Sequence, residues 1–222
     1  PKQVEQEIVG LLDLVDEMLG AFGYPYTIEV ATKPDDKALG SDADWDSALE
    51  VLTGTLREKG VPFEYDHGGG AFYGPKLDFK LIDAIGRRWQ GPTVQLDFNL
   101  PERFELEYVG EDNEKHQPVM LHRVLVGSME RFVGGLIEHY AGAFPLWLAP
   151  EQIRILPVSE NLKEPAQVLE GKLIKAGVRA SVIERDTLGS RIRDAEMLKI
   201  PYMAVIGKEE EKNGTVALRK RG

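Results

Sequence analysis

The sequence predicts two domains of different fold class: an α+β domain with an antiparallel sheet over residues 1–150, and a small α/β domain over residues 151–222. Alternation of apolar and polar residues in the first part is typical of antiparallel strands with one polar face. In the second part strand patterns alternate with helix patterns, which is typical of an α/β domain. The charge divides in the same way, with a net of −13 over residues 1–150 and +3 over residues 151–222.

The first domain is expected to open with a helix over residues 4–22, where apolar residues recur every three or four positions. A second amphipathic helix is expected over residues 42–60, with Gly60 as its stop signal. Short strands are expected at residues 26–31 and 62–66. The glycine-rich stretch that follows the second of these strands predicts a turn.

Two longer strands, residues 76–83 and 93–100, are expected around a turn near Gly86. Their alternation predicts an apolar face and a polar face, namely Leu77, Phe79, Leu81, Val94, Leu96, Phe98 and Leu100 on the first and Lys76, Asp78, Lys80, Thr93, Gln95, Asp97 and Asn99 on the second. A polar face of this kind can simply meet solvent. Its amides, hydroxyl group and mixed charges are also suited to holding a polar small molecule.

A further hairpin is expected from ELEYVG (105–110) and PVMLHRVLV (118–126), and the second segment leads into a Gly-Ser turn and a helix. Ser128 is the expected N-cap of that helix. Two glycines inside it, Gly134 and Gly135, predict the close approach of another backbone. The buried stripe of the helix is expected to consist of Met129, Phe132, Val133, Leu136, Ile137 and Tyr140.

Arg131 lies in the first turn of this helix, where the helix dipole disfavours a cation. A phosphate bound nearby and an ion pair with a neighbouring glutamate explain the arginine equally well. His122 lies in the preceding strand between Met120 and Val124. A hydrogen-bonded core histidine is a commoner role at such a position than a metal ligand, so the pattern alone favours the core role.

The second domain follows a proline-punctuated exit segment, AGAFPLWLAP (141–150). Its strands are expected at residues 153–159, 178–185, 202–207 and 215–221, and its helices at residues 164–177 and 187–200. Its charge of +3 is small enough to be ordinary surface charge, although a basic domain can hold nucleic acid through the phosphates.

Composition excludes several classes of site. With 222 residues and 42% hydrophobic residues the chain can bury a core, and the absence of cysteine excludes disulfides and thiolate metal sites within it. No apolar run approaches membrane-spanning length, and the first residues do not resemble a signal peptide, so we expect no membrane partner.

Four segments, FYGPKLDF (72–79), WQGPTVQLDFNLPERF (89–104), HQPVMLHRVLVGSMERF (116–132) and GLIEHYAGAFPLWLAPEQ (135–152), resemble the threonyl-tRNA synthetases, a family of class II aminoacyl-tRNA synthetases. The turn and helix that contain Ser128 resemble motif 3 of that class. The resemblance covers essentially the whole chain. It implies the motif 3 half of a class II catalytic core, followed by an anticodon-binding domain that lacks its C-terminal end.

This resemblance implies roles in ATP binding and catalysis for five residues. Arg131 matches the motif 3 arginine that contacts ATP, and Glu130 would orient it. Gln90 and Thr93 would bind ATP. Lys76 would take part in both substrate binding and catalysis.

The resemblance also implies threonine, metal and tRNA contacts. Tyr73 and Gln95 would bind the substrate. His122 would be one of three protein ligands of a zinc ion that binds the amino and hydroxyl groups of threonine and so discriminates against valine. In the second domain, Arg193 and Glu210 would lie near the anticodon loop.

The implied function is that of a threonine–tRNA ligase. Threonine and ATP, the latter with Mg²⁺, would give threonyl-adenylate and pyrophosphate, and the threonyl group would then pass to tRNA(Thr). The family implies a homodimer and a cytoplasmic location. Motifs 1 and 2, the other two zinc ligands and an editing domain would precede residue 1, so the chain alone is expected to be inactive.

Two alternatives stay open. One is another class II ligase such as the prolyl enzyme, which the Tyr-Gly-Pro-Lys turn (73–76) and His122 disfavour. The other is a non-catalytic tRNA-binding or regulatory synthetase-like module.

Overall fold

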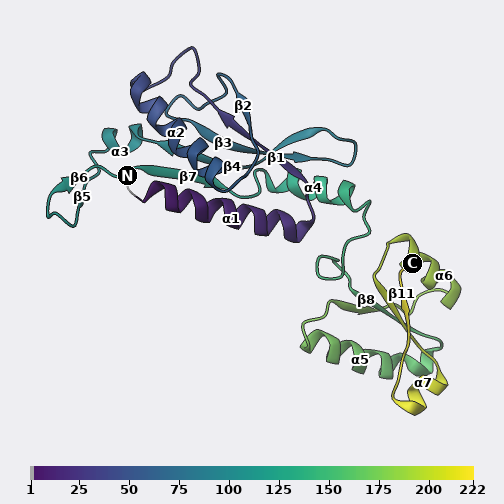
Figure 1. Ribbon diagram of the computed structural model, residues 1–222. Coiled ribbons are helices and arrows are strands. Elements are labelled where there is room, and N and C mark those ends of the chain that lie inside the picture. Colours follow the sequence, from purple (N-terminus) through teal and green to yellow (C-terminus); the bar gives the residue numbers. More distant parts are fainter. Residues whose placement is uncertain (1–2) are drawn as a thin grey trace. The chain divides into compact units, whose positions relative to one another are not determined.

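The computed structural model describes residues 3–222, and contacts divide the chain into two compact units, Pro1–Leu136 and Ile137–Gly222 (Figure 1). Each unit has its own sheet and its own helices. None of the helices within residues 3–222 has the length and apolar character needed to span a membrane.

Two long helices of unit 1 form where the apolar spacing predicts them. Helix α1 (Val4–Phe22) buries Ile8, Leu12, Val15 and Leu19, which recur at three- and four-residue intervals. Its end is fixed by a residue in the left-handed conformation, Gly23. Helix α2 (Asp42–Glu58) begins at a reciprocal capping box between Ser41 and Asp44.

A five-stranded sheet forms the centre of unit 1, in the order β2-β1-β3-β4-β7. Strands β1 and β2 are parallel, and every other pairing in this sheet is antiparallel. The strands are β1 (Tyr26–Ala31), β2 (Glu64–Asp66), β3 (Lys76–Ile82), β4 (Arg88–Asp97) and β7 (Met120–Val124).

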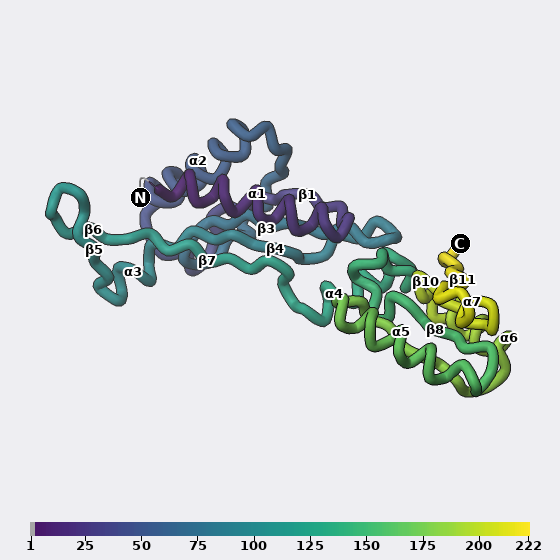
Figure 2. The backbone as a smooth tube through the Cα atoms, turned by 90° about the horizontal axis from the view of Figure 1, so that it is seen from below, coloured from purple at the N-terminus to yellow at the C-terminus, as the bar shows by residue number. Residues whose placement is uncertain are grey.

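Helices α1 and α2 pack against each other, α1 also contacts β4, and α2 also contacts β1 (Figure 2). Both helices therefore cover one face of the sheet. The apolar alternation of β3 and β4 supplies the core beneath them, and Leu77, Phe79, Val94 and Leu96 are all buried. The polar face that the alternation predicts lies on the other side of the same strands.

The strand predicted over residues 93–100 ends earlier than expected, and one predicted hairpin is wrong. Strand β4 stops at Asp97, and a short helix, α3 (Asn99–Arg103), follows it. Segment 105–110 pairs instead with residues just after it, through β5 (Tyr108–Val109) and β6 (Lys115–His116). Segment 118–126 supplies β7, which pairs with β4. The nearer partner wins the pairing of β5 because closing a short loop costs less entropy.

Helix α4 (Met129–His139) begins at Ser128, as predicted, because the Ser128 hydroxyl accepts a hydrogen bond from the backbone N–H of Arg131 at 3.4 Å. Its buried stripe is narrower than predicted, since Phe132 and Leu136 are buried whereas Met129 and Val133 are 58% and 44% exposed. The expected backbone approach at the two glycines is also wrong. Nothing lies close to Gly134, and a Cβ at Gly135 would collide with the side-chain hydroxyl of Tyr24.

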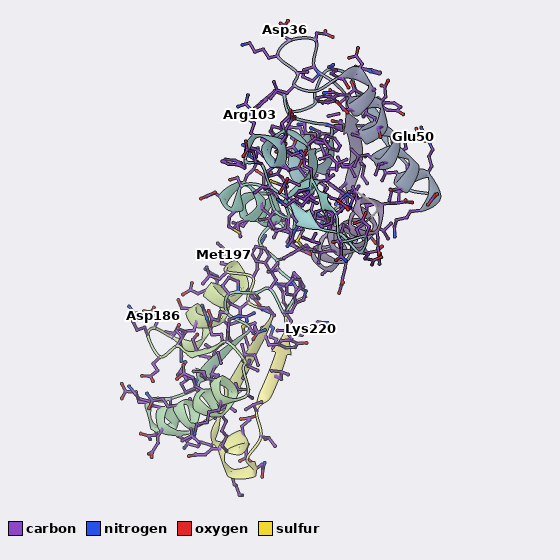
Figure 3. All side chains as sticks on the ribbon, turned by 90° about the vertical axis from the view of Figure 1, so that its left-hand side faces the viewer. Asp36, Glu50, Arg103, Asp186, Met197 and Lys220 are labelled. Atoms are coloured by element: carbon purple, nitrogen blue, oxygen red, sulfur yellow. The ribbon has the colours of Figure 1, made fainter. Side chains whose placement is uncertain are left out.

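Unit 2 contains a four-stranded sheet in the order β11-β10-β8-β9, with β8 parallel to both neighbours. Its core has two parts, around Ile155, Ala166 and Ala204 and around Leu156 and Met203. Figure 3 shows how the side chains, such as that of exposed Met197, project from its elements. The elements are β8 (Ile153–Pro157), a 3-10 turn (Glu160–Leu162), α5 (Lys163–Lys175), β9 (Ala180–Val182), α6 (Leu188–Met197), β10 (Tyr202–Ile206), α7 (Lys208–Asn213) and β11 (Ala217–Lys220).

Candidate functional site

The polar face of the unit 1 sheet gathers most of the predicted site residues. Lys76 of β3 pairs with Gln95 of β4, and Gln95 pairs with His122 of β7, so one row crosses three strands. The next row places Asp78 opposite Thr93. Directly paired residues point to the same side of a sheet, so residues from three separate segments share one surface.

Tyr73 reaches this surface from the turn before β3. Its hydroxyl donates a hydrogen bond to Gln95 Oε1, and Gln95 Nε2 lies 3.4 Å from the Thr93 hydroxyl. Gly74 makes the approach possible, because any Cβ at that position would overlap the backbone carbonyl of Leu96. The Asn99 amide also holds the turn, by donating to the Tyr73 carbonyl at 2.8 Å.

A carboxylate that the sequence pattern did not single out links the rest of the surface. Asp78 Oδ1 accepts hydrogen bonds from Thr93 Oγ1 at 3.0 Å and Gln90 Nε2 at 2.9 Å, and its Oδ2 lies 2.8 Å from Lys76 Nζ. Lys80 Nζ donates to Gln90 Oε1 at 2.8 Å. A continuous polar network thus joins five predicted site residues, Tyr73, Lys76, Gln90, Thr93 and Gln95, and does not include Glu130 or Arg131. The sequence feature that could have identified Asp78 is an acidic residue within the polar alternation of a central strand.

His122 lies on this surface and is not sealed in a core. Its ring is tilted against that of Tyr73 with the centroids 5.5 Å apart, and its side chain is 36% exposed. Nε2 lies 2.8 Å from Oδ2 of Asp97, whose side chain is fully buried. Burial, and secondarily the charge of Asp97, raises the pKa of the Tyr73 hydroxyl. Two predicted substrate-binding residues are thus neighbours of His122, Gln95 as its pairing partner in the sheet and Tyr73 through its ring.

Asp97, which contacts His122, also accepts hydrogen bonds at the start of α3. The other carboxylate oxygen of Asp97, Oδ1, accepts hydrogen bonds from the backbone N–H groups of Asn99 and Leu100 at 2.8 and 3.0 Å. One buried side chain therefore begins α3 and holds the imidazole of His122. Within residues 3–222 no group of three or more His, Cys, Asp or Glu side chains could hold a metal ion.

Arg131 lies over an aromatic ring. Its guanidinium carbon is 5.9 Å from the centroid of Trp89, within the range of a cation–π contact. Glu130 accepts a hydrogen bond from the Ser128 hydroxyl at 2.9 Å, and hydrogen bonds, first from its own backbone N–H and then from Ser128, lower its pKa. In the part of the chain that the structure describes, Arg131 forms no ion pair with Glu130. The alternative of a paired arginine thus loses support.

The turn between β3 and β4 fixes Trp89 in place. Asp83 accepts hydrogen bonds from Trp89 Nε1 at 2.8 Å, from Arg87 Nε at 2.6 Å, and from the backbone N–H groups of Arg87 and Ile85. Burial raises the pKa of Asp83, but the hydrogen bonds from Trp89 and Arg87 outweigh it and hold the pKa well below its usual range. Sequence reasoning missed this support for Arg131, because Trp89 and Arg131 are far apart in the chain.

The two predicted tRNA residues lie in different settings in unit 2. Arg193 is an exposed residue of α6. Glu210 belongs to the capping box of α7, because its Oε2 accepts a hydrogen bond from the backbone N–H of Gly207 at 2.9 Å. Glu210 therefore already has a structural role, whereas Arg193 is open to a ligand.

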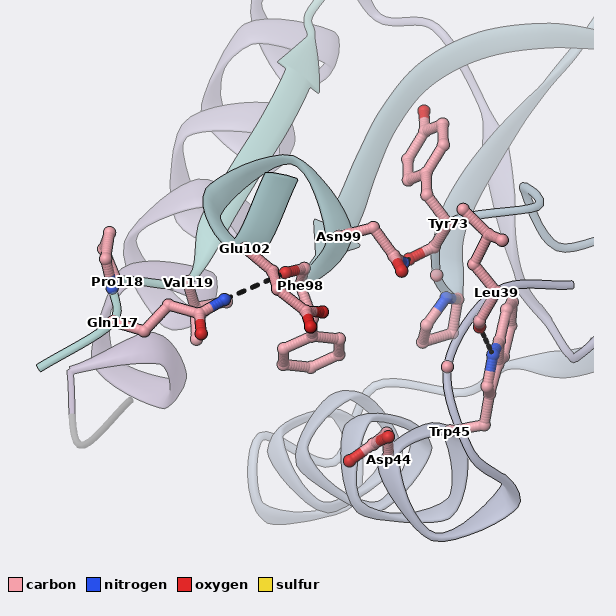
Figure 4. Close-up of a pocket in the computed structure, with 13 residues that line it drawn as sticks. Leu39, Asp44, Trp45, Tyr73, Phe98, Asn99, Glu102, Gln117, Pro118 and Val119 are labelled. Carbon is pink, nitrogen blue, oxygen red and sulfur yellow. Dashed lines mark hydrogen bonds between the residues drawn. The ribbon is translucent and has the colours of Figure 1, made fainter. Parts of the chain in front are cut away.

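A cavity of about 420 Å³ lies beside the polar face, bordered by α2, α3 and the segment before β3 (Figure 4). Trp45 and Phe98 line it, and Trp45 Nε1 donates to the Leu39 carbonyl at 2.7 Å. The phenol ring of Tyr73 extends away from Trp45 in this view. Tyr73 lines the cavity and also belongs to the polar network, so the cavity adjoins the network at Tyr73.

Comparison with known proteins identifies the family. Residues 1–140 match the family described as "tRNA synthetase class II core domain (G, H, P, S and T)". The chain belongs to the class II aminoacyl-tRNA synthetases. Residues 152–222 match the family described as "Anticodon binding domain". This class II synthetase chain therefore joins part of a catalytic core to a tRNA-recognition domain, as the sequence predicts.

Similar proteins within this class include threonine–tRNA ligases and a threonyl-tRNA synthetase of known structure. Over its whole length the class II synthetase chain is 50% identical to a threonine–tRNA ligase of Carboxydothermus hydrogenoformans and 52% identical to one of Fusobacterium nucleatum. A crystal structure of the RNA-binding domain of threonyl-tRNA synthetase from Cryptosporidium parvum superposes with a TM-score of 0.94 at 36% identity, covering 100% of this chain and 56% of that one. The chain spans only 35% and 36% of the two curated relatives.

Proposed function

We propose that this chain is the motif 3 half of the catalytic domain and the anticodon-binding domain of a threonine–tRNA ligase, with the functional boundary at residues 150/151. The observation that carries the proposal is the polar face, where Lys76, Gln95 and His122 form one row across three strands. The complete protein would activate threonine with ATP and Mg²⁺ and transfer it to tRNA(Thr). It would act as a cytoplasmic homodimer.

Each polar side chain has a task in the first half-reaction, in which the threonine carboxylate attacks the α-phosphorus of ATP and pyrophosphate leaves. Lys76 offers a positive charge to the carboxylate and phosphate oxygens, and Gln90 and Thr93 orient the nucleotide. Arg131, held over Trp89, binds the phosphate end of ATP through charge-assisted hydrogen bonds. Tyr73 and Gln95 bind the amino acid. Catalysis here is positioning and charge stabilisation.

His122 fits one ligand position of the zinc ion that the family implies. Asp97 engages Nε2 and leaves Nδ1 for a metal, and a carboxylate on the far nitrogen is the usual support of zinc-bound histidines. When bound, zinc supplies a Lewis-acid site for the amino and hydroxyl groups of threonine. The other ligands would come from outside residues 3–222. By holding this zinc ion, His122 would help the protein to discriminate between threonine and valine.

The test is amino-acid-dependent ATP–pyrophosphate exchange by the complete protein that contains this chain. We expect exchange with threonine, much weaker exchange with serine, and none above background with valine or proline. Exchange with proline in place of threonine would establish the prolyl alternative. No exchange with any amino acid, together with retained tRNA binding, would establish the non-catalytic module.

A further inference from the structure

Asp78 is the most connected side chain on the polar face and is almost completely enclosed, with 2% of the side chain exposed. It contacts Gln90, Thr93 and Lys76 at 2.9, 3.0 and 2.8 Å. Lys80 Nζ lies 3.7 Å from the same carboxylate. Three residues of the proposed substrate site, Lys76, Gln90 and Thr93, therefore contact one carboxylate. That carboxylate is too enclosed for a substrate to contact it directly.

The burial of the Asp78 carboxylate indicates that this side chain has a specific role. A buried ionised group costs free energy unless it is paired and hydrogen-bonded, and an apolar side chain would fill the same space without that cost. All the contacts of Asp78 go to side chains of the polar face, and none of the backbone N–H groups among residues 3–222 bonds to it. It therefore fixes side chains and not the strands that carry them.

The contact with Lys76 leaves the ammonium group usable. Asp78 Oδ2 lies within ion-pair distance of Lys76 Nζ, yet among the described residues it accepts no hydrogen bond of good geometry. The Lys76 side chain is 21% exposed. The flexible lysine stem is held by charge, and because an ammonium has three N–H donors, at least two of them stay available for a ligand.

We propose that Asp78 is a positioning residue that holds Lys76, Gln90 and Thr93 in the arrangement in which they bind ATP and threonine. The inference rests on the proposed function. Long polar side chains lose freedom when they bind a ligand, and a group that orders them beforehand lowers that cost. Asp78 does so from beneath the substrate surface.

The experiment compares Asp78→Asn, Asp78→Glu and the control Glu29→Gln in the complete protein. Asparagine keeps the size and one acceptor oxygen but removes the charge facing Lys76. We expect kcat/KM for threonine-dependent pyrophosphate exchange to fall roughly 100-fold, the scale of a displacement of about 1 Å in a site. Asp78→Glu should recover at least part of that loss. Glu29, which pairs with Lys80 at 3.3 Å on the same face, should be replaceable with little effect.

A double-mutant cycle separates positioning from a merely structural role. If Asp78 acts through Lys76, then Lys76→Met should cost much less in the Asp78→Asn background than in the wild type, because the two effects share one interaction. Additive losses would overturn the proposal. So would equal losses in Asp78→Asn and Glu29→Gln.

Crystal structures of the wild-type and Asp78→Asn proteins give a readout that does not depend on activity. We expect the Lys76 ammonium and the Gln90 amide to leave their positions while the strands stay in place. Unmoved side chains would overturn the proposal even if activity fell. If Asp78→Asn does not fold, Asp78→Glu is compared with the wild type. Side-chain positions and activity that are kept together or lost together support positioning, and lost activity with unmoved side chains contradicts it. A wild-type protein without any exchange would refute the proposed function, while the crystal comparison would still test Asp78.

Discussion

Two buried carboxylates, Asp78 and Asp97, determine where the polar side chains of the unit 1 sheet point. Asp78 joins Lys76 and Thr93, and Asp97 holds His122. Both are outward-facing positions in the alternation, yet both are buried, with 1% and 0% exposed. The neighbouring polar side chains cover them, so a position that alternation assigns to solvent becomes the base of a site.

Arg131→Ala in the complete protein should weaken the use of ATP much more than that of threonine. Loss of a charge-assisted contact to phosphate costs about 1.5–3 kcal/mol, which corresponds to roughly a 10- to 150-fold rise in KM for ATP. Exchange kinetics at varied ATP and varied threonine measure both constants. Arg57→Ala, which removes an exposed arginine paired with Glu50 at 3.3 Å, is the control. An unchanged KM for ATP with unchanged kcat would remove Arg131 from the site.

His122→Ala in the complete protein should lose bound zinc and threonine activation together, while the fold survives because the side chain is partly exposed. Metal content by mass spectrometry and the melting temperature are the two measurements. His116→Ala is the matched control, since His116 contacts an aspartate, Asp112, in the β5–β6 hairpin at 2.8 Å and lies outside the polar face. Zinc that stays at one per chain after loss of His122 would make His122 a structural histidine.

At the scale of elements, the sheet of unit 1 is tied to its helices and turns by polar side chains at a few junctions. Asp83 fastens the β3–β4 turn, and Asp97 joins the end of β4 to α3. At the junction of α1 and β1, the Tyr26 hydroxyl donates to Asp16 Oδ1 at 2.8 Å. Burial, and then the hydrogen bond and charge of Asp16, raise the pKa of Tyr26 from 10.0 to about 12. These contacts join the strands of the sheet to the helices and the turn next to them.

Tyr26 should make stability depend on pH in the alkaline range. Its folded pKa lies above the unfolded value, so its contribution is present below pH 10 and is lost as the pH rises from about 10 to about 12. Tyr26→Phe should lower the free energy of unfolding by about 0.5–1.5 kcal/mol at pH 8, and the difference from wild type should shrink by pH 11.5. Urea unfolding at both pH values measures this. Tyr108→Phe, at a 44% exposed position, should show neither effect, and a constant difference for Tyr26→Phe would contradict the assignment.

At the scale of the whole molecule, charge is unevenly distributed along the chain. Residues 1–150 carry a net charge of −13, which repels a nucleic acid, whereas residues 151–222 carry +3. The second part also matches an anticodon-binding family. The proposed tRNA contact is therefore expected within residues 151–222. The chain itself covers about a third of the length of the threonine–tRNA ligases it resembles.

Arg193→Ala in the complete protein should weaken tRNA(Thr) binding and reduce the slope of log Kd against log salt by about 0.7–0.9, the value for one lost phosphate contact. Lys175→Ala, which removes an exposed cation from α5, is the control of equal charge. Filter binding across a salt series measures both. An unchanged affinity and slope for Arg193→Ala would place the tRNA contact elsewhere.

The 222-residue chain alone should not form threonyl-adenylate, because residues 3–222 provide only His122 as the proposed zinc ligand and no group of three or more side chains that could hold a metal ion. Threonine-dependent pyrophosphate exchange by this chain, compared with that of the complete protein at equal concentration, is the measurement. Exchange well above background would show that residues 1–222 hold a complete site.

The sequence by itself determined the five longer helices, the alternation of β3 and β4, the two fold classes and the family, whereas the short helices α3 and α7 were not predicted. These follow from local periodicity and from short motifs such as the turn at 73–76, and local spacing is preserved in a linear pattern. Five predicted site residues, Lys76, Gln90, Thr93, Gln95 and His122, lie on the polar face where alternation placed them or where the resemblance implied a site.

Only the tertiary structure decided how β5 and β7 pair and which polar residues are buried. The pairing of β7 with β4 joins segments separated by other elements, and no periodicity encodes such a contact. The burial of Asp78, the support of His122 by Asp97 and the position of Arg131 over Trp89 depend on the same long-range pairings. The sequence determines which chemical groups are present. The packing of distant segments determines which of these groups come into contact. The strength of a charge interaction or hydrogen bond then depends on burial, which only the assembled fold provides.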